Sequence, residues 1–469
     1  MNPGATIEML STGDEPLDAI LGGGVPLRSV NVVAGTPGSG KTLFTMQTFF
    51  RLARRGMKCL YFTTLSEPAV KLIRYIQAFP FYDERLLDDA VRFVDVSTVL
   101  RTNGAEEAVS AIIARVEKEQ PALVAIDSFK AIGDLMPEPV RHRTLVHDLA
   151  VHTATWGATT FLVGEYAANE IASWPEFAIA DGIILLAYRP VELTAVRELS
   201  ILKLRGANYV AGTHFLDITS EGVRFHPRVR APEAGDHWSA GERVTSGVRG
   251  LDALLGGGLP RGSATVVQGA SGTGKTLLGL HFAMEGAHRG EPAALFILEE
   301  TPDQLRQIAR GFGGDPGALE ARGALHLHYA SPVELSTDRF LNEVRDRMTR
   351  IGARRVVLDS LTSLALGVLS ERRFKELVYA LSKHVRAVGA TLLMTMEIPE
   401  LLGSSVLSGH GVSFAADNLV QLRYVEAGGR LERGVLVIKV RGSNHATQAH
   451  HVDVDERGLC VGAPLSSAR

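Results

Sequence analysis

The chain has 469 residues, of which 45% are hydrophobic and 22% charged, with a formal net charge of −3. That length exceeds what one hydrophobic core usually supports, so it predicts a globular protein of two domains, and the charge excludes a general positive field for nucleic acid. Cys59 and Cys460, the two cysteines, lack metal-type spacing, which excludes a zinc module or a disulfide framework and fits a reducing cytosol. The start, MNPGATIEML, does not resemble a signal peptide, and no apolar run is long enough for a membrane span, so we expect a cytoplasmic protein.

In chain order, the first strong signal is an apolar run, NVVA, that leads into the pattern G-x-x-x-x-G-K-[ST]. In this pattern, glycines let backbone N–H groups surround a phosphate chain, the lysine reaches the β- and γ-phosphates, and the threonine hydroxyl ligates Mg²⁺. The following segment, TLFTMQTFFRLARR, is typical of a helix, as that mechanism requires. The predicted ATP-binding residues are Gly35, Thr36, Pro37, Gly38, Ser39, Gly40, Lys41 and Thr42.

The same pattern recurs as part of a long internal repeat. LDAILGGGVPLRSVNVVAGTPGSGKTLF begins at Leu17, and LDALLGGGLPRGSATVVQGASGTGKTLL begins at Leu251. The similarity continues through VAIDSF and VVLDSL, and through LKLRGANY and IKVRGSNH, which indicates a duplicated domain. The second set of predicted ATP-binding residues is Gly269, Ala270, Ser271, Gly272, Thr273, Gly274, Lys275 and Thr276.

Each half alternates short β-rich apolar runs with longer helix-like segments. Runs such as ALVAIDS and TTFLVGE suit central strands of a parallel sheet that helices cover on both faces. We therefore predict an α/β fold of two tandem P-loop domains, each a mostly parallel sheet flanked by helices. The polar stretch RVRAPEAGDHWSAGER predicts a linker at 228–243, between a first domain at 1–227 and a second at 244–469.

An aspartate ends one apolar run in each half. Asp127 follows ALVAI, and Asp359 follows RRVVL. A carboxylate in this place commonly anchors Mg²⁺ together with the P-loop threonine. Either aspartate alone is more often a helix N-cap, but its matched spacing from a P-loop favours the metal role. The predicted Mg²⁺ ligands are therefore Thr42 with Asp127, and Thr276 with Asp359.

The second half also carries a candidate for the group that orients water during hydrolysis. LFILEETP ends an apolar run with adjacent Glu299 and Glu300, near the edge where nucleotides bind in such sheets. The alternative is an acidic helix start before Pro302, which the helix dipole would favour. In the first half the matching segment, YFTTLSEP, lacks the pair and leaves only Glu67 nearby. We therefore expect the two halves to be catalytically unequal.

Together, these blocks resemble a known family. LGGGVP and LGGGLP before the P-loops, EETP, IDS and LDS, and KLRG and KVRG are similar to blocks of the KaiC family, the double-domain RecA-like ATPases related to the cyanobacterial circadian clock protein. The resemblance spans roughly Leu17 to Val461. It implies two RecA-like domains, ATP and Mg²⁺ as cofactors, and a homo-oligomer in the form of a hexameric ring with ATP at the subunit interfaces.

The resemblance also implies roles for single residues. Glu299 and Glu300 match the family's catalytic glutamate pair, and Lys275 of the second loop acts with them. Four cations match residues that reach the γ-phosphate of the neighbouring protomer, namely Lys203, Arg205, Lys439 and Arg441. A cation supplied in trans stabilises transition-state charge and couples hydrolysis to ring assembly. Without the resemblance, solvated strand ends would be the preferred interpretation of these cations.

Clock members of the family phosphorylate themselves on adjacent Ser and Thr residues of the second domain. Aligning SFAADNLVQLRYVE with that segment puts Ser413 at the serine position and Phe414 at the threonine position. The dyad is incomplete, so Ser413 is a candidate phosphosite, and an unmodified interface serine is the favoured alternative. Together with the missing glutamate pair of the first half, this predicts a KaiC-like paralogue rather than a clock component.

Three functional hypotheses remain open. The first is an ATPase ring that acts as a nucleotide-dependent switch for an unknown signalling partner, with Ser autokinase activity in the second domain as an addition. The second is a RecA-like recombinase or motor that depends on nucleic acid, which the lack of a dense basic loop with interleaved aromatics disfavours. The third, compatible with the first, is that the first domain binds ATP as an assembly platform while the second hydrolyses it.

Overall fold

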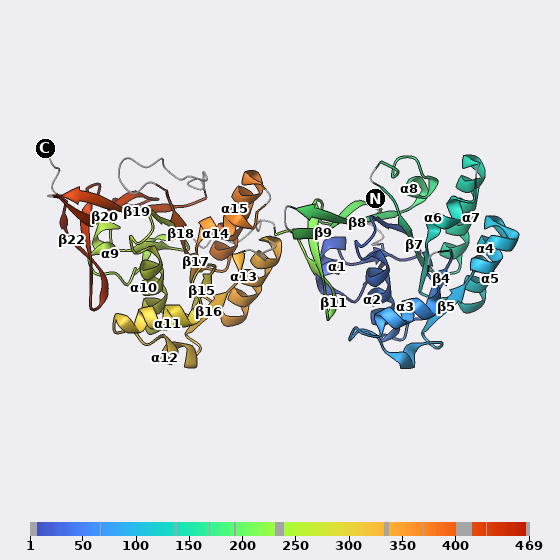
Figure 1. Ribbon diagram of the computed structural model, residues 1–469, viewed down its shortest axis with the longest axis horizontal. Helices are drawn as coiled ribbons and strands as arrows, with labels where there is room; N and C mark the ends of the chain where they lie inside the picture. Colours follow the sequence, from blue (N-terminus) through green and yellow to red (C-terminus); the bar gives the residue numbers. More distant parts are fainter. Residues whose placement is uncertain are drawn as a thin grey trace, which may run out of the picture. The chain divides into compact units, whose positions relative to one another are not determined.

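The computed structural model describes residues 7–65, 67–136, 138–167, 169–191, 194–229, 239–332, 337–368, 370–399, 415–427 and 429–465. The chain divides into two compact units, and the division falls between Arg228 and Val229. Each unit is built around one large sheet with helices on its faces (Figure 1). Within the described ranges, no helix is long and apolar enough to cross a membrane.

The sheet of the first unit has nine strands among the described residues. In sheet order they are β11 (Gly222–His226), β10 (Thr213–Thr219), β9 (Thr194–Leu204), β8 (Gly182–Val191), β3 (Val30–Gly35), β7 (Thr159–Glu165), β6 (Leu123–Asp127), β4 (Cys59–Thr63) and β5 (Val91–Asp95). All pairings from β8 to β5 are parallel, whereas β8, β9, β10 and β11 pair antiparallel. The parallel part therefore holds the P-loop strand β3 between β7 and β8.

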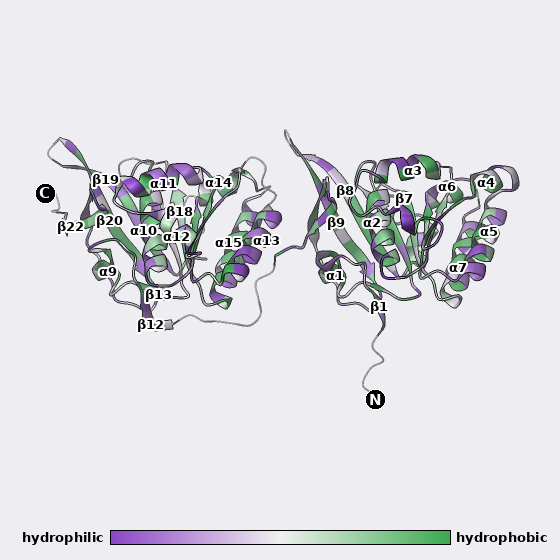
Figure 2. Cartoon of the chain, turned by 90° about the horizontal axis from the view of Figure 1, so that it is seen from below, coloured by the Kyte–Doolittle hydropathy of each residue, from purple (hydrophilic) through white to green (hydrophobic). Residues whose placement is uncertain are grey.

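The helices of the first unit connect these strands. They are α1 (Glu15–Leu21), α2 (Lys41–Ala53), α3 (Ala69–Ile76), α4 (Ser97–Asn103), α5 (Ala105–Glu119), α6 (Phe129–Gly133), α7 (Pro139–Thr155) and α8 (Pro175–Ile179), with a 3-10 turn at Glu84–Leu86. The short strands β1 (Met9–Leu10) and β2 (Val25–Pro26) pair with each other before β3. Figure 2 shows that the central strands are largely hydrophobic, whereas helices such as α5 and α7 carry both kinds of residue.

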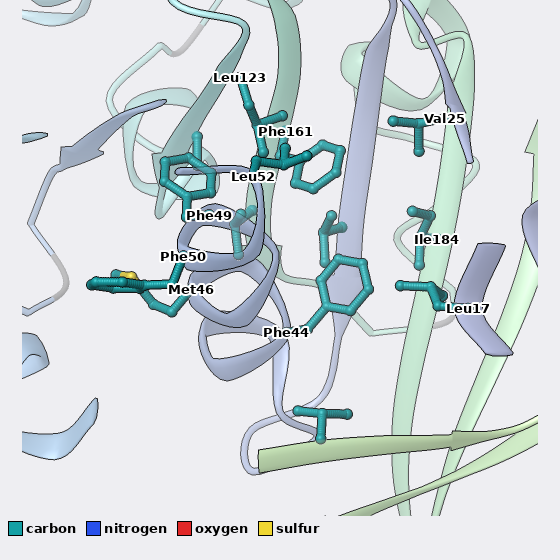
Figure 3. Close-up of a cluster of buried hydrophobic side chains, with 14 of the residues drawn as sticks. Leu17, Val25, Phe44, Met46, Phe49, Phe50, Leu52, Leu123, Phe161 and Ile184 are labelled. Carbon is teal, nitrogen blue, oxygen red and sulfur yellow. The ribbon is translucent and has the colours of Figure 1, made fainter. Parts of the chain in front are cut away.

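The sheet of the first unit buries an apolar cluster on each face. On one face, Phe44, Phe49 and Phe50 of α2 pack with Phe161 of β7 and Ile184 of β8 (Figure 3). The cluster on the other face combines alternate strand residues with side chains from α5, α6 and α7. Because successive residues of a strand point to opposite faces, the continuous apolar runs of the sequence are explained by a sheet covered on both sides.

The second unit repeats this arrangement. Its sheet order is β16 (Leu325–Tyr329), β15 (Ala293–Ile297), β17 (Arg355–Asp359), β18 (Thr391–Glu397), β14 (Ala264–Gly269), β19 (Asn418–Ala427), β20 (Arg430–Val440), β21 (His450–Asp455) and β22 (Gly458–Pro464). The P-loop strand β14 again lies between two parallel neighbours, β18 and β19. The predicted α/β class and the mostly parallel sheets are therefore confirmed in both units.

The helices and the short strands of the second unit complete its description. The helices are α9 (Leu251–Leu254), α10 (Lys275–His288), α11 (Pro302–Gly311), α12 (Pro316–Ala321), α13 (Thr337–Ile351), α14 (Leu361–Leu366) and α15 (Glu371–Ala387). A short antiparallel pair, β12 (Ser239–Val244) and β13 (Leu259–Arg261), precedes β14. α10 follows the second P-loop as α2 follows the first, so both candidate loops join a central strand to a helix.

One buried cation distinguishes the second unit from the first. Arg355, at the start of β17, is 1% exposed and donates to Glu291 Oε2 at 2.7 Å and to the carbonyl oxygen of Thr245 at 2.7 Å. Its guanidinium also lies over the Phe282 ring, 4.9 Å from the centroid. The equivalent first residue of β6 is the apolar Leu123. Arg355 therefore ties the start of this unit to its sheet.

Replacing Arg355 by Ala is expected to destabilise the second unit by about 2–4 kcal/mol, because the change empties a packed position and removes the donor to two backbone carbonyl oxygens. Amide hydrogen exchange on the full chain measures the effect, with faster exchange expected in β17 and α10. Exchange in β6 and α2 of the first unit serves as the internal control. Unchanged protection of β17 would contradict the structural role of Arg355.

Candidate functional site

The first P-loop joins β3 to α2, and its glycines stand where a side chain would not fit or where the backbone is left-handed. A Cβ on Gly35 would lie 2.0 Å from the carbonyl oxygen of Leu186, and Gly40 has a left-handed φ of 99°. Lys41 begins α2, and its Nζ donates to the carbonyl oxygen of Thr36 at 2.9 Å. The first N–H groups of a helix lack intrahelical acceptors, so this end of α2 is suited to a phosphate.

The second P-loop has the same geometry between β14 and α10. A Cβ on Gly269 would lie 2.4 Å from the carbonyl oxygen of Leu422, and Gly274 has a φ of 104°. Lys275 Nζ donates to the carbonyl oxygen of Ala270 at 2.9 Å. The pKa of Lys275, like that of Lys41, is lowered by burial, and neighbouring carboxylates partly offset that effect. Both lysines thus lie beside acidic groups at the loop.

Asp127 lies beside the first P-loop at the end of β6. It is 8% exposed, and its Oδ2 accepts hydrogen bonds from Thr42 Oγ1 at 2.9 Å and from the Tyr61 hydroxyl at 2.5 Å. Burial raises the pKa of Asp127, whereas the hydrogen bonds from Tyr61 and Thr42 lower it. Burial and the Asp127 charge raise the pKa of Tyr61 well above its usual range, so its hydroxyl stays a donor.

Asp359 occupies the equivalent place at the end of β17, with a different donor. It is 6% exposed, and Thr395 Oγ1 donates a short hydrogen bond to Asp359 Oδ1. Burial raises the pKa of Asp359, and hydrogen bonds from Thr395 and Thr276 act in the opposite direction. The structure thus brings each predicted threonine and aspartate together at the phosphate cradle.

These pairs fit Mg²⁺ when it is bound together with phosphate oxygens. Mg²⁺ usually takes one or two protein oxygens and completes its octahedron with waters and substrate phosphates. Thr42 with Asp127, and Thr276 with Asp359, offer one hydroxyl and one carboxylate in each unit. In the part of the chain that the structure describes, no group of three or more His, Cys, Asp or Glu is placed to hold a metal by itself. The donor set therefore fits a Mg²⁺ ion that is bound together with a nucleotide.

The two glutamates of the second unit differ in their surroundings. Glu299 Oε1 accepts hydrogen bonds from Ser360 Oγ at 2.6 Å and from Ser363 Oγ at 2.5 Å. Glu300 Oε2 is buried without a hydrogen-bond partner among the described residues, and burial, followed by the Asp359 charge, raises the pKa of Glu300. Both line a cavity of about 270 Å³ that Lys275 also lines. The pair thus provides one fixed carboxylate and one with an unused acceptor.

The start of α11 bears on the alternative that this pair is only the acidic beginning of a helix. α11 begins at Pro302, and its N-cap is Thr301, whose side chain forms a capping box with Gln304. Glu299 and Glu300 therefore precede the N-cap and lie outside the first turn of the helix. The capping groups of α11 are supplied without them, which leaves the pair available at the cavity.

The first unit lacks this arrangement. Leu65 is 42% exposed, and Ser66, which aligns with the other glutamate, lies outside the described residues. Glu67 lines a cavity of about 750 Å³ with Lys41 and forms an ion pair with Lys71 at 2.8 Å, one turn along α3. The expected inequality of the two halves therefore extends to the arrangement of side chains.

The sequence analysis missed a further carboxylate at the equivalent place in each cavity. Glu165 ends β7, and its Oε1 lies 3.7 Å from Lys41 Nζ. Glu397 ends β18 and lines the second cavity with Lys275. The sequence does carry a signal for them, because each glutamate ends an apolar strand at the same place in the repeat, as the two predicted Mg²⁺ aspartates do.

The four cations of the K-x-R-G blocks lie away from the cavity of their own unit. Lys203 Nζ donates to the carbonyl oxygen of Ala178 at 3.2 Å, and Lys439 Nζ donates to that of Ala416 at 2.9 Å. Two ion pairs hold the arginines, Arg205 with Asp181 at 3.4 Å and Arg441 with Asp417 at 3.1 Å. None of the four is among the described residues that line the two cavities. Ser413 falls outside the described residues.

Comparison with known proteins places the whole chain in one group. The family model described as "ATPase: KaiC" matches residues 10–230 and again 244–466. The chain is 30% identical to "Circadian clock protein KaiC3" of Synechocystis sp. over 98% of this chain and 92% of that protein. It is also 30% identical to "Circadian clock oscillator protein KaiC" of Picosynechococcus sp., over 97% of this chain and 90% of that protein. The chain therefore belongs to the KaiC family of ATPases, and carries two copies of the family's ATPase domain.

Proposed function

We propose that this protein is a ring-forming ATPase whose nucleotide state acts as a switch, with hydrolysis mainly in the second domain. The proposal rests on one difference between the two P-loop sites, which otherwise match. Both have a P-loop with a threonine and a buried aspartate beside it, but only the second has Glu299 and Glu300 at the cavity. ATP would bind in both domains, with Mg²⁺ neutralising charge between its phosphates.

In the second domain, each side chain has a separate task. Lys275 and the N–H groups at the start of α10 hold the phosphates, and Thr276 with Asp359 holds the metal. Glu300, with its unused acceptor, orients the attacking water and takes up its proton. Glu299 keeps the Glu300 backbone in place, because Ser360 and Ser363 fix its carboxylate.

The first domain would bind ATP as a platform for assembly. Glu67, the carboxylate nearest in sequence to the position of the missing pair, forms an ion pair with Lys71 at the surface. Replacing Glu67 by Gln is therefore expected to change ATP turnover by at most about twofold, as is usual for an exposed ion pair. Steady-state phosphate release by the full chain measures this. A loss greater than that caused by changing the second-domain pair would reverse the ranking of the domains.

The proposal also includes assembly into a ring and a signal to a partner protein. Lys203, Arg205, Lys439 and Arg441 lie outside the cavity of their own unit, so a neighbouring protomer is the site that they would serve. A hexamer with ATP at its interfaces would then change with nucleotide state and signal to a protein partner. Ser413 is a candidate acceptor for autophosphorylation, which would add a second, slower switch.

One assay separates these activities. The full chain is incubated with γ-labelled ATP and Mg²⁺, and released phosphate and protein-bound label are followed together. Released phosphate without label on the protein is expected for a hydrolase, and label that disappears in Ser413→Ala would establish the autokinase. A parallel sample with DNA tests the alternative of a recombinase or motor, which requires strong stimulation by nucleic acid. No phosphate release in any sample would contradict the proposal.

A further inference from the structure

A hydroxyl group holds the metal-site aspartate in each unit, but the two hydroxyls come from different strands. In the first unit, the Tyr61 hydroxyl on β4 donates to Asp127 Oδ2 at 2.5 Å. In the second, Thr395 on β18 donates to Asp359 Oδ1. β4 and β18 are not equivalent strands, because β4 corresponds to β15 and β18 corresponds to β7. The two copies therefore use different neighbours for one task.

The strand register shows that the first unit has no hydroxyl at the position where the second unit has Thr395. In the first unit, Val163 of β7 pairs with Asp127. In the second unit, Leu358 pairs with Met394, which places the next residue, Thr395, beside Asp359. Val163 is fully buried and offers no donor at this position. The direct neighbour of Asp127 on this side therefore cannot replace Thr395.

On the opposite side of each aspartate, where β4 or β15 is the neighbouring strand, the first unit has the hydroxyl and the second unit does not. Tyr61 lies two residues before Thr63, the residue that pairs with Asp127. Its equivalent, Leu295, lies two residues before Ile297, which pairs with Asp359. Two residues along a strand span about 7 Å, a distance that a tyrosine reaches and a leucine has no group to bridge. The longer side chain of Tyr61 thus reaches Asp127 although Tyr61 lies two residues away from the strand position beside it.

The packing of Tyr61 fixes where its hydroxyl lies. The side chain is 0% exposed, and its ring is 5.6 Å from the Phe49 ring and 5.5 Å from the Phe93 ring, measured between centroids. A buried tyrosine hydroxyl needs a polar partner, and here the partner is the same Asp127 oxygen that accepts from Thr42. The aspartate oxygen is thereby held from β4 and from α2 at once.

We propose that Tyr61 is a positioning residue for the Mg²⁺ site of the first domain, replacing the hydroxyl that Thr395 supplies in the second. The inference rests on the proposed function, because it takes Asp127 as the metal ligand. Partners that orient a ligating carboxylate commonly change metal affinity by about 10- to 100-fold when they are removed. A residue that only fills the core would affect stability and leave the metal dependence unchanged.

The test measures ATP binding by the full chain as a function of Mg²⁺ concentration. Lys275→Ala is introduced in every sample to silence the second site, so that labelled ATP reports on the first. Tyr61→Phe, which keeps the ring and removes the hydroxyl, is expected to raise the Mg²⁺ concentration for half-maximal binding by about 10- to 100-fold. Binding of ATP in the presence of a chelator is expected to remain unchanged, because the P-loop itself is intact.

A rescue variant separates positioning from packing. Adding Val163→Thr to Tyr61→Phe rebuilds the arrangement of the second domain and is expected to return the half-maximal Mg²⁺ concentration to near that of the parent. The matched change in the second domain is Thr395→Val in a chain silenced at the first site by Lys41→Ala, which is expected to shift in the same direction as Tyr61→Phe.

Two results would overturn the inference. One is an unchanged Mg²⁺ dependence in Tyr61→Phe, and the other is an equal loss of binding with and without the chelator that Val163→Thr does not restore. A parent chain with intact P-loops that shows no Mg²⁺-dependent ATP binding would instead refute the proposed function. The two failures are therefore distinguishable within one titration series.

Discussion

Replacing Glu299 and Glu300 together by glutamine is expected to lower ATP turnover in the second domain by about 100-fold or more. A positioned general base typically contributes a factor of this size, and glutamine keeps the side-chain volume while removing the basic oxygen. The first domain keeps its P-loop, because ATP bound there is proposed to support assembly. The residual turnover of that domain is measured in a Lys275→Ala chain and subtracted. Phosphate release under saturating ATP measures the turnover.

The single substitutions assign the two tasks. Glu300→Gln is expected to reproduce most of the loss, because Glu300 Oε2 is buried with no hydrogen-bond partner among the residues that the structure describes. Glu299→Gln is expected to have a smaller effect, because Ser360 and Ser363 can still donate to an amide oxygen. ATP binding is measured as a control and should be retained in both variants. Turnover that survives the double substitution would rule out the pair as the catalytic group.

Removing Arg441 is expected to lower second-domain turnover by about 1,000-fold, the scale on which an arginine supplied in trans acts. In the structure, Arg441 pairs with Asp417 at 3.1 Å and is not among the described residues lining its own cavity. The proposed catalytic role of Arg441 therefore assigns it to the cavity of a neighbouring protomer. Phosphate release by Arg441→Ala, corrected for the residual turnover of a Lys275→Ala chain, measures the loss.

Mixing two inactive chains tests the direction of this contact. Arg441→Ala keeps its P-loop, and Lys275→Ala keeps its arginine, so interfaces that combine them are complete. Random assembly would make about a quarter of the interfaces complete, because a ring joins unlike faces of its subunits. Activity should therefore return on mixing, and a chain carrying both substitutions should remain inactive in the same assay. Failure to recover activity in rings of verified mixed composition would place Arg441 outside the neighbouring site.

The main features of the fold and of the phosphate cradles could be predicted because they depend on local patterns. A P-loop requires a strand, a glycine-rich turn and a helix in direct succession, and these are contiguous around Lys41 and Lys275. Asp127 could be paired with Thr42 because both follow the ends of parallel strands, which meet at one edge of the sheet. Their hydrogen bond at 2.9 Å agrees with that reasoning.

The hydrogen-bond partners of the carboxylates could not be predicted in the same way. Tyr61 and Asp127 are 66 residues apart, and their contact depends on the register between β4 and β6. An apolar run fixes which residues are buried but not which residue of the next strand lies beside each one. The same reason explains why the serines that hold Glu299 were not identified in advance.

The amino-acid sequence thus determines the duplication, the fold class and the two P-loops, since each follows from residues close together in the chain. It also reveals that the first copy lacks the glutamate pair. Only the folded sheets show that Ser360 donates to Glu299, whereas Glu300 Oε2 has no partner among the described residues. They also show that Tyr61 donates to Asp127 in one copy, and Thr395 to Asp359 in the other. The physical reason is that a buried hydrogen bond depends on strand register and side-chain reach, which become defined when distant segments pack together.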